Sequence, residues 1–240
     1  MKISIIFPCY NECGSIKKLY TILKKFPKKY DAEFILVENG STDNSRKIFK
    51  ELPKTSNVKL VYIDKNQGYG YGIIQGVQAA TGDYIGWLHS DLQYNPLDLI
   101  PFFEYIKNHQ SEKLLLKGKR KNRKLIEYFF TFGMGIYDTL LFKHKMSNVM
   151  AMPVIFNREL LSNHKDHNLQ LLLPKDFTID IFIYALAIKQ NYTIKHLPIR
   201  LQKRKSGKSS WNTGLKSQIK LSFKMIKGSK KVKQELKVIK

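Results

Sequence analysis

Short apolar runs alternate along the first half of the chain with segments whose apolar residues recur at helical spacing. The predicted strands are Lys2–Phe7, Glu33–Val37, Val58–Ile63, Tyr84–Leu88 and Leu114–Leu116, and the predicted helices are Ser15–Phe26, Asp43–Leu52, Gly72–Ala80 and Leu97–Asn108. This alternation predicts an α/β fold with a mostly parallel sheet and helices on both faces. Ligands bind such sheets at the carboxyl ends of the strands, so the polar residues that follow each strand are the candidate site.

The second half of the chain contains longer helical segments. The aromatic-rich segment 125–142 predicts a helix that lies either in a membrane interface or in the core. A helix at Ile181–Lys189 and a strand at Tyr192–Leu197 follow. Leu215, Ile219, Phe223 and Ile226 then recur at helical spacing with lysines between them. They predict a basic amphipathic helix, which binds either a membrane surface or the domain itself.

The charge of the chain requires an anionic partner or surface. It has 240 residues and a formal net charge of +23, from 42 Lys and Arg against 19 Asp and Glu. Residues 201–240 hold 13 of the basic residues and one acidic residue. Nucleic acid, anionic lipid and phosphorylated substrates all remain open at this stage. Cys9 and Cys13 lack the second pair that a zinc site needs, which favours a reduced, cytosolic chain.

Three candidate metal ligands follow the predicted strand Tyr84–Leu88. His89, Asp91 and Gln93 stand at alternating positions, so they can point to one side of an extended segment. Carboxylate and amide oxygens suit Mg²⁺, and an imidazole suits Mn²⁺ better. The alternative is an ordinary turn between a strand and a helix, with Asp91 as a helix cap.

Polar or glycine-rich loops also follow the first three predicted strands. They are Pro8–Glu12, Glu38–Ser45 and the segment 64–76, which holds Gly68, Gly70, Gly72 and Gly76. Glycines at this density let the backbone approach a ligand or a neighbouring strand. The dinucleotide fingerprint Gly-x-Gly-x-x-Gly is not met, because Ile73 or Gln75 stands where the third glycine belongs.

Four of these segments resemble, in the same order, the motifs of family-2 glycosyltransferases. They are Phe7-Pro8-Cys9-Tyr10-Asn11-Glu12, Val37-Glu38-Asn39-Gly40-Ser41-Thr42-Asp43-Asn44-Ser45, Asn66-Gln67-Gly68, and Ser90-Asp91-Leu92-Gln93 with Pro96. The Asp-Leu-Gln ending and the later basic segments look most like the dolichyl- or polyprenyl-phosphate sugar synthase branch. The resemblance covers roughly residues 2–120 well and 150–215 loosely. It implies a single GT-A domain, a nucleotide-binding α/β fold.

The resemblance also implies a site for a nucleotide-diphosphosugar donor, either a UDP- or a GDP-sugar. Its nucleotide-sugar-binding residues are then Pro8, Tyr10, Asn11, Glu12, Glu38, Ser41 and Gly68, and Asp91 holds Mg²⁺ or Mn²⁺. Family members usually have aspartate at the positions of Glu38 and His89. His89 therefore either ligates the metal or hydrogen-bonds the diphosphate, with Asp91 and Gln93 completing the metal site.

The acceptor residues are predicted on the same basis. Arg120 matches an arginine that helps to hold the acceptor phosphate, and Arg204 and Lys208 lie in a basic segment similar to that of the synthase branch. Asp180 occupies the position of a general base in relatives that transfer to hydroxyl groups. An alcohol acceptor must lose a proton, whereas a phosphate acceptor is already anionic and needs cations to position it.

These features predict an inverting, metal-dependent glycosyltransferase that transfers a sugar to a polyprenyl phosphate at the cytoplasmic face of a membrane. Residues 1–210 form the predicted domain, with a donor half (1–120) and an acceptor half (121–210), and residues 211–240 form a basic helix and tail. One alternative is transfer to a hydroxyl of a lipid-linked or surface glycan, with Asp180 as base. Another is a non-catalytic protein that binds nucleotide sugars or nucleic acid. We expect peripheral attachment to an anionic membrane surface and no specific nucleic-acid partner.

Overall fold

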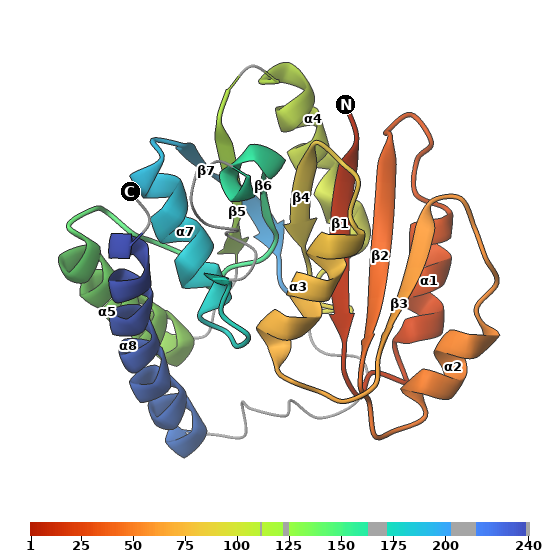
Figure 1. Cartoon of the computed structure of the whole chain (residues 1–240), viewed down its shortest axis with the longest axis horizontal. Helices are drawn as coiled ribbons and strands as arrows, with labels where there is room; N and C mark the ends of the chain where they lie inside the picture. Colours follow the sequence, from red (N-terminus) through yellow and green to blue (C-terminus); the bar gives the residue numbers. More distant parts are fainter. Residues whose placement is uncertain (111, 122–124, 163–171, 203–214, 239–240) are drawn as a thin grey trace.

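The computed structural model describes residues 1–110, 112–121, 125–162, 172–202 and 215–238, and it contains a seven-stranded sheet. The strands are β1 (Ile3–Cys9), β2 (Ala32–Asn39), β3 (Val58–Ile63), β4 (Tyr84–Trp87), β5 (Leu114–Lys121), β6 (Val154–Asn157) and β7 (Thr193–Arg200). Their order is β3-β2-β1-β4-β6-β5-β7, and β6 alone runs antiparallel to its neighbours (Figure 1). The predicted mostly parallel α/β sheet is confirmed.

Helices cover both faces of this sheet. They are α1 (Ile16–Lys24), α2 (Ser45–Glu51), α3 (Tyr69–Ala79), α4 (Ile100–Asn108), α5 (Leu125–Phe142), α7 (Ile179–Lys189) and α8 (Leu215–Val238), with short 3-10 helices at Pro96–Leu99 and Arg158–Leu161. In Figure 1, α3 and α7 lie in front of the sheet, and α1 and α4 lie behind it. Every residue of β1 and of β4 is buried as a result. Burial on both faces explains why these strands are continuous apolar runs without polar alternation.

The glycines of α3 serve the packing of that helix on its neighbours. A Cβ atom added at Gly76 would collide with the side chain of Ile6 in β1, and one at Gly70 would collide with the carbonyl oxygen of Pro174. The backbone of α3 therefore approaches both the sheet and the loop 174–178 closely. Of the two predicted uses of these glycines, close contact with neighbouring chain is the one observed.

The start of α3 and the presence of β6 differ from the prediction for physical reasons. α3 begins at Tyr69, three residues before the predicted start, because the two glycines at Gly70 and Gly72 are tolerated by its tight packing. β6 was not predicted, since four residues are too few to show a periodicity. Its pairing with β4 and β5 nevertheless joins the two halves of the sheet.

The C-terminal helix α8 packs against α5 and α7. Gly228 of α8 lies against Thr178, which precedes α7, and the hydroxyl of Ser229 donates a hydrogen bond to Asp138 Oδ1 of α5 at 2.7 Å. Met225, Val232 and Leu236 are buried in this contact. The predicted basic amphipathic helix therefore exists, and its apolar side docks on the chain itself.

The opposite sides of α5 and α8 expose apolar residues. Phe132, Ile136 and Leu140 of α5 are 55%, 47% and 75% exposed, and Ile219 and Phe223 of α8 are 41% and 63% exposed. α5 is thus not a buried core helix along its described side chains, which begin at residue 131. In the described part of the chain, no helix combines the length and the apolar character needed to cross a bilayer.

Candidate functional site

The loops after β1 and β2 are joined by hydrogen bonds at the carboxyl edge of the sheet. Asn11 has a positive φ of 55° and inserts its side chain into the second loop, where Oδ1 accepts the amide of Thr42 at 2.9 Å. The amide of Asn11 donates to Ser41 Oγ at 3.2 Å, and the amide of Glu12 donates to Ser45 Oγ at 2.9 Å. The tertiary structure thus brings the first two predicted nucleotide-binding motifs together.

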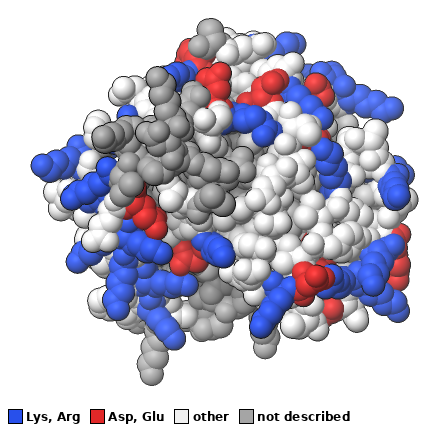
Figure 2. Space-filling view, in the orientation of Figure 1, with Lys and Arg blue, Asp and Glu red and all other residues white. Residues whose placement is uncertain are grey.

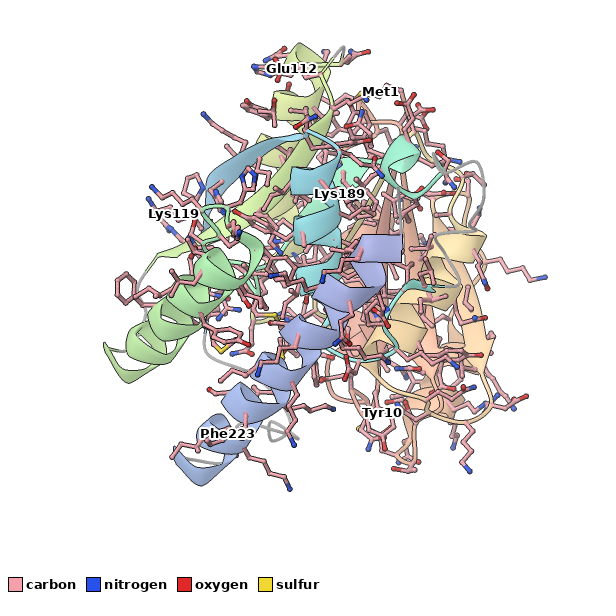
Figure 3. All side chains as sticks on the ribbon, turned by 60° about the vertical axis from the view of Figure 1, so that its left-hand side comes forward. Met1, Tyr10, Glu112, Lys119, Lys189 and Phe223 are labelled. Atoms are coloured by element: carbon pink, nitrogen blue, oxygen red, sulfur yellow. The ribbon has the colours of Figure 1, made fainter. Side chains whose placement is uncertain are left out.

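Glu38 organises the second of these loops from below. Its side chain is fully buried, Oε1 accepts the amide of Ser41 at 2.7 Å, and Oε2 lies 3.6 Å from Arg46 Nε. The carboxylate therefore holds the first turn of the loop and pairs with a cation. The predicted contact of Glu38 with a base or ribose stays a prediction. Tyr10, at the same edge of the sheet, is 39% exposed (Figure 3).

The segment after β4 is tied to the first motif and to the end of β7. Ser90 Oγ donates a hydrogen bond to the carbonyl oxygen of Pro8 at 2.9 Å, so the first and fourth motifs are adjacent. Asp91 Oδ1 accepts the amide of Gln93 at 3.0 Å around a Leu92 whose φ is +58°. The carbonyl oxygen of Gln93 in turn accepts the amide of Gln202 at 2.8 Å.

His89 lies between two tyrosine rings. Its ring stacks on Tyr94 at 6.2 Å between centroids and is tilted against Tyr69 at 5.7 Å. Tyr69 in turn stacks on Phe177 at 4.9 Å. Sequence reasoning did not identify this aromatic row, because its members come from three separate segments. It fixes the orientation of the imidazole, which stands two residues before Asp91.

The donor set at this edge suits a metal ion that is shared with a ligand. No three His, Cys, Asp or Glu side chains in the described ranges are grouped closely enough to hold a metal by themselves. Asp91 is 8% exposed and offers one carboxylate, and His89 and Gln93 flank it. Mg²⁺ is typically bound through one or two carboxylates together with phosphate oxygens of a substrate. Asp91 therefore fits a divalent ion that arrives with a diphosphate.

Asp180 lies in the first turn of α7 with a fully buried carboxylate. Its Oδ1 accepts a hydrogen bond from the indole Nε1 of Trp87 at 3.0 Å, while Oδ2 has no hydrogen-bond partner among the described residues. Burial raises the pKa of Asp180, and the nearby charges of Lys117 and Arg120 oppose that effect. A carboxyl group with a raised pKa and one oxygen without a hydrogen-bond partner can act as a general base or can accept a hydrogen bond from a hydroxyl group.

Lys117 of β5 is the residue of this site that sequence reasoning missed. It stands among lysines and arginines directly after the predicted strand Leu114–Leu116, yet its side chain is completely buried. Its Nζ has no hydrogen-bond partner in the described part of the chain, and burial lowers its pKa to about 8. The only available signal was its position directly after three leucines, within the strand.

The predicted acceptor residues are only partly placed. Arg120 lies near the end of β5, where its Nη2 donates to the carbonyl oxygen of Met150 at 2.9 Å. Arg204 and Lys208 lie outside the described residues. Gly68 has a φ of +117° and packs against the backbone of Lys175, in the loop that leads to Asp180. Gly68 is therefore a structural link between the donor loops and α7.

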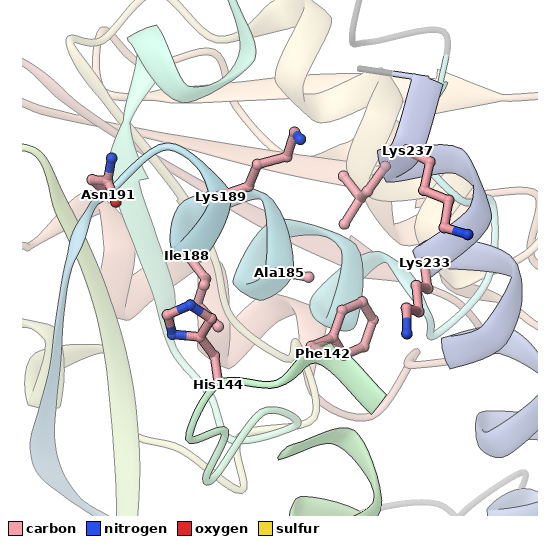
Figure 4. Close-up of a pocket in the computed structure, with 9 residues that line it drawn as sticks. Phe142, His144, Ala185, Ile188, Lys189, Asn191, Lys233 and Lys237 are labelled. Atoms are coloured by element: carbon pink, nitrogen blue, oxygen red, sulfur yellow. The ribbon is translucent and has the colours of Figure 1, made fainter. Parts of the chain in front are cut away.

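A separate surface pocket lies far from these residues (Figure 4). It has a volume of about 330 Å³ and lies among the C-terminal parts of α5, α7 and α8. Its walls are formed by Phe142, His144, Ala185, Ile188, Lys189, Asn191, Lys233, Leu236 and Lys237. None of the predicted site residues lines it, and Lys189 ends the helix whose first turn carries Asp180. This pocket is not part of the candidate site.

Comparison with known proteins agrees with the geometry of this edge. The model of the family described as "Glycosyl transferase family 2" matches residues 4–164. A dolichol-phosphate mannosyltransferase from Pyrococcus furiosus is 30% identical over 108 residues, which are 45% of this chain and 31% of that protein. An undecaprenyl-phosphate 4-deoxy-4-formamido-L-arabinose transferase from Proteus mirabilis is 36% identical over 104 residues, 42% of this chain and 32% of that protein. The matched region thus spans about a third of these curated relatives.

Solved structures show the same fold at low sequence identity. Glucosyl-3-phosphoglycerate synthase from Mycobacterium tuberculosis, in complex with Mn²⁺, UDP-glucose and phosphoglyceric acid, has a TM-score of 0.70 at 15% identity and covers 96% of this chain and 79% of its own. Its complex with Mg²⁺ and UDP has a TM-score of 0.65 at 16% identity, over 95% of this chain and 77% of its own. The predicted GT-A fold is confirmed by this likeness.

Proposed function

Because this chain belongs to glycosyltransferase family 2, we propose that it transfers a sugar from a UDP- or GDP-sugar to a polyprenyl phosphate. The observation that carries the proposal is the junction at Gln93. The backbone of Gln93 joins the Asp91 loop to Gln202, at the end of β7. Gln202, which precedes the basic segment in the sequence, therefore lies beside the predicted donor site. A phosphate acceptor needs cations next to the donor, and the lysines and the arginine that follow Gln202 in the sequence are proposed for this role.

The donor is held by the joined loops in this proposal. Tyr10 and the loop amides that Asn11 orders face the nucleotide, and Glu38 keeps the second loop in place from beneath. Asp91, with Gln93 and His89 beside it, would hold Mg²⁺ or Mn²⁺ together with the donor diphosphate. A bound divalent ion neutralises the charge that develops on the departing nucleotide.

The acceptor phosphate attacks the anomeric carbon from the face opposite to the leaving nucleotide, which inverts the configuration at that carbon. Arg120, on β5, and the cations of the basic segment, among them Arg204 and Lys208, position the phosphate. A phosphate is already anionic, so no proton has to be removed from it. The proposal therefore requires no base.

Transfer to a hydroxyl of a lipid-linked or surface glycan is the second candidate, and Asp180 favours it. The open Oδ2 and the raised pKa of Asp180 are properties of a base that removes a proton from an alcohol. Substitution of this residue separates the two candidates. With a phosphate acceptor, Asp180→Asn retains substantial turnover at saturating donor. With an alcohol acceptor, the variant loses nearly all activity while its nucleotide binding is unchanged.

We further propose that the protein works at the inner face of an anionic membrane. The proposal is supported by the exposed apolar side chains of α5 and α8, which are Phe132, Ile136, Leu140, Ile219 and Phe223. Lys and Arg side chains gather over α8 at the left of Figure 2, and the whole chain has a net charge of +23. In Figure 3, Phe223 lies toward the same end of the molecule as Tyr10, at the donor edge. A membrane surface bound at these side chains would thus lie at the same end of the molecule as the donor edge.

The direct test offers a panel of UDP- and GDP-sugars with undecaprenyl phosphate and Mn²⁺ or Mg²⁺. We expect a lipid-linked sugar from one donor class, and the absence of lipid product with every donor would favour the glycan alternative. Membrane binding is measured by sedimentation with vesicles that contain phosphatidylglycerol. Phe223→Ser should reduce binding roughly tenfold, because about 1.5 kcal/mol of apolar burial is lost. Leu97→Ser is the matched control, since Leu97 is exposed elsewhere.

A further inference from the structure

Lys117 and Asp180 carry opposite charges, are buried near each other, and each have one charged atom without a hydrogen-bond partner among the described residues. Lys117 Nζ and Asp180 Oδ2 both lack a partner among the described residues, and both side chains are almost completely excluded from solvent. Each affects the pKa of the other, so they are neighbours. Burial of an unpaired charge is costly, and a native structure keeps such groups where a ligand or water completes them.

The hydrogen bond between Trp87 and Asp180 occupies one carboxylate oxygen and leaves the other without a partner among the described residues. The indole of Trp87 donates to Oδ1 at 3.0 Å, and Trp87 itself is held in the core against Phe156. Oδ2 is therefore the atom that remains for another donor. Lys117 lies on β5 and Asp180 on α7, so the two reach the same space from the sheet and from the helix that covers it.

The chemistry of the pair selects the group that can complete it. An ammonium only donates hydrogen bonds, and a carboxylate only accepts them. A group between them must accept from Lys117 and donate to Asp180, which a hydroxyl does. An unprotonated phosphate oxygen accepts only, and the negative charge of Asp180 would repel it.

The pair lies behind the metal-binding residue rather than at the outer surface. Burial is the largest cause of the raised pKa of Tyr69, and the charges of Asp180 and Asp91 raise this pKa further, so this tyrosine lies near both carboxylates. The ring of Tyr69 contacts His89, and the backbone of Tyr71 donates to the carbonyl oxygen of Lys175 in the loop before α7. Tyr69 therefore connects Asp180 with the position where the donor is expected.

We propose that Lys117 and Asp180 together bind one hydroxyl group of the transferred sugar and so determine donor specificity. The inference rests on the proposed function, because a polyprenyl phosphate acceptor has no hydroxyl proton to give to Asp180 and the hydroxyl then belongs to the donor. A sugar that lacks this hydroxyl leaves two buried charges uncompleted. Loss of such a hydrogen bond to charged groups reduces affinity roughly 10- to 100-fold.

The experiment compares donor binding with nucleotide binding. Dissociation constants of UDP, GDP, UDP-glucose and GDP-mannose are measured by titration calorimetry with Mn²⁺ for the wild type, Lys117→Met and Lys119→Met. Lys119, labelled in Figure 3, is an exposed lysine two residues along the same strand and serves as the matched control. We expect Lys117→Met to leave nucleotide binding unchanged and to weaken binding of the preferred nucleotide sugar roughly 10- to 100-fold.

Deoxy analogues of the preferred donor identify the hydroxyl without any substitution in the protein. Among the 2-, 3-, 4- and 6-deoxy donors, we expect one to bind the wild type roughly 10- to 100-fold more weakly than the parent donor does. The affinity for this analogue should not fall further in Lys117→Met. Equal effects of the substitution on the parent donor and on all four analogues would overturn the inference, and so would no effect at all. Both would mean that only a water molecule completes the pair.

Failure of the proposed function gives a different result. Absence of binding by UDP, GDP and both nucleotide sugars would overturn the donor site and this inference together. If one deoxy donor and the Lys117→Met substitution weaken donor binding non-additively but no lipid product forms, the result would support the inference and refute only the polyprenyl phosphate acceptor. A thermal unfolding curve for Lys117→Met detects misfolding, and the deoxy donors test the wild type without any substitution.

Discussion

Replacement of Asp138 with Asn tests how α8 is held on the domain. Asp138 lies on α5, is 2% exposed and accepts a hydrogen bond from Ser229 of α8 at 2.7 Å. Burial raises the pKa of this carboxyl from 3.8 to about 6, and the Ser229 hydrogen bond opposes the effect only in part. The ionised side chain therefore reduces the free energy of unfolding at neutral pH, which a neutral amide of similar shape does not do.

The magnitude follows from the difference between the folded and unfolded pKa values. Because the folded pKa is the higher one, the stability that this group contributes is complete below about pH 3.8 and is lost as the pH rises to about 6. At 1.36 kcal/mol per pKa unit, the cost of the carboxylate is about 3 kcal/mol at pH 7.5 and about 1.6 kcal/mol at pH 5. Asn adds a buried N–H group whose cost does not depend on pH. The expected signal is therefore the difference between the cost of the carboxylate at pH 7.5 and its cost at pH 5, about 1.4 kcal/mol.

Urea-induced unfolding followed by circular dichroism at pH 5.0 and 7.5 measures this quantity. Asp138→Asn should gain about 1.4 kcal/mol relative to the wild type when the pH is raised from 5.0 to 7.5. Asp31→Asn provides the control, since Asp31 is exposed and far along the chain from α5 and α8. A gain that is the same at both pH values, or equal to that of the control, would refute the reasoning.

Three further predictions concern the donor site and the sheet. Asp91→Asn should weaken UDP binding in the presence of Mn²⁺ by tenfold or more, and should leave metal-free binding unchanged, as titration calorimetry can measure; equal losses with and without metal would contradict the assignment. Glu33→Gln should lower the free energy of unfolding by roughly 3 kcal/mol at pH 7, measured by urea unfolding, because it removes a buried, ion-paired carboxylate whose pKa is lowered to about 2. The wild type should lose this contribution to stability as the pH falls from 4.5 toward 2. A stability that does not change over this pH range would contradict the prediction. Gly76→Ala should cost roughly 1–3 kcal/mol by collision with Ile6, whereas Gly133→Ala, with open space around it, should be neutral or stabilising in thermal unfolding; similar values for the two would be inconsistent with the close packing of α3.

Local patterns predicted most of the fold correctly. The alternation of apolar strands and amphipathic helices identified four of the first five strands to within two residues at each end, because burial on both faces makes each strand a continuous apolar run. β5 was predicted as Leu114–Leu116 but extends to Lys121, since the pairing with β7 overrides the basic composition of its second half. β6 left no pattern, and its antiparallel pairing depends on strands that are distant along the chain.

The parts of the candidate site that consist of short sequence motifs were predictable from the sequence. The segments around Asn11, Ser41 and Asp91 were identified in order, and the structure brings them to one edge of the sheet through the contacts of Asn11 with Thr42 and of Ser90 with Pro8. Adjacency along the chain could not show that Glu38 points inward. Whether a polar side chain at the end of a strand faces a ligand or the core depends on how neighbouring loops cover it.

The sequence by itself determined the α/β alternation, the order of the polar loops and the basic character of the chain, because these depend on residues that are close along the chain. Only the tertiary structure decided which charges are buried. Lys117 belongs by sequence to a run of solvated cations, yet the packing of α7 on the sheet places it beside Asp180 without a partner. Likewise, the sequence of α8 left open whether this helix binds a membrane surface or the domain itself, and the contacts of Ser229 and Gly228 dock it on α5 and α7. Desolvation is a property of the assembled neighbourhood, so no local pattern of residues predicts it.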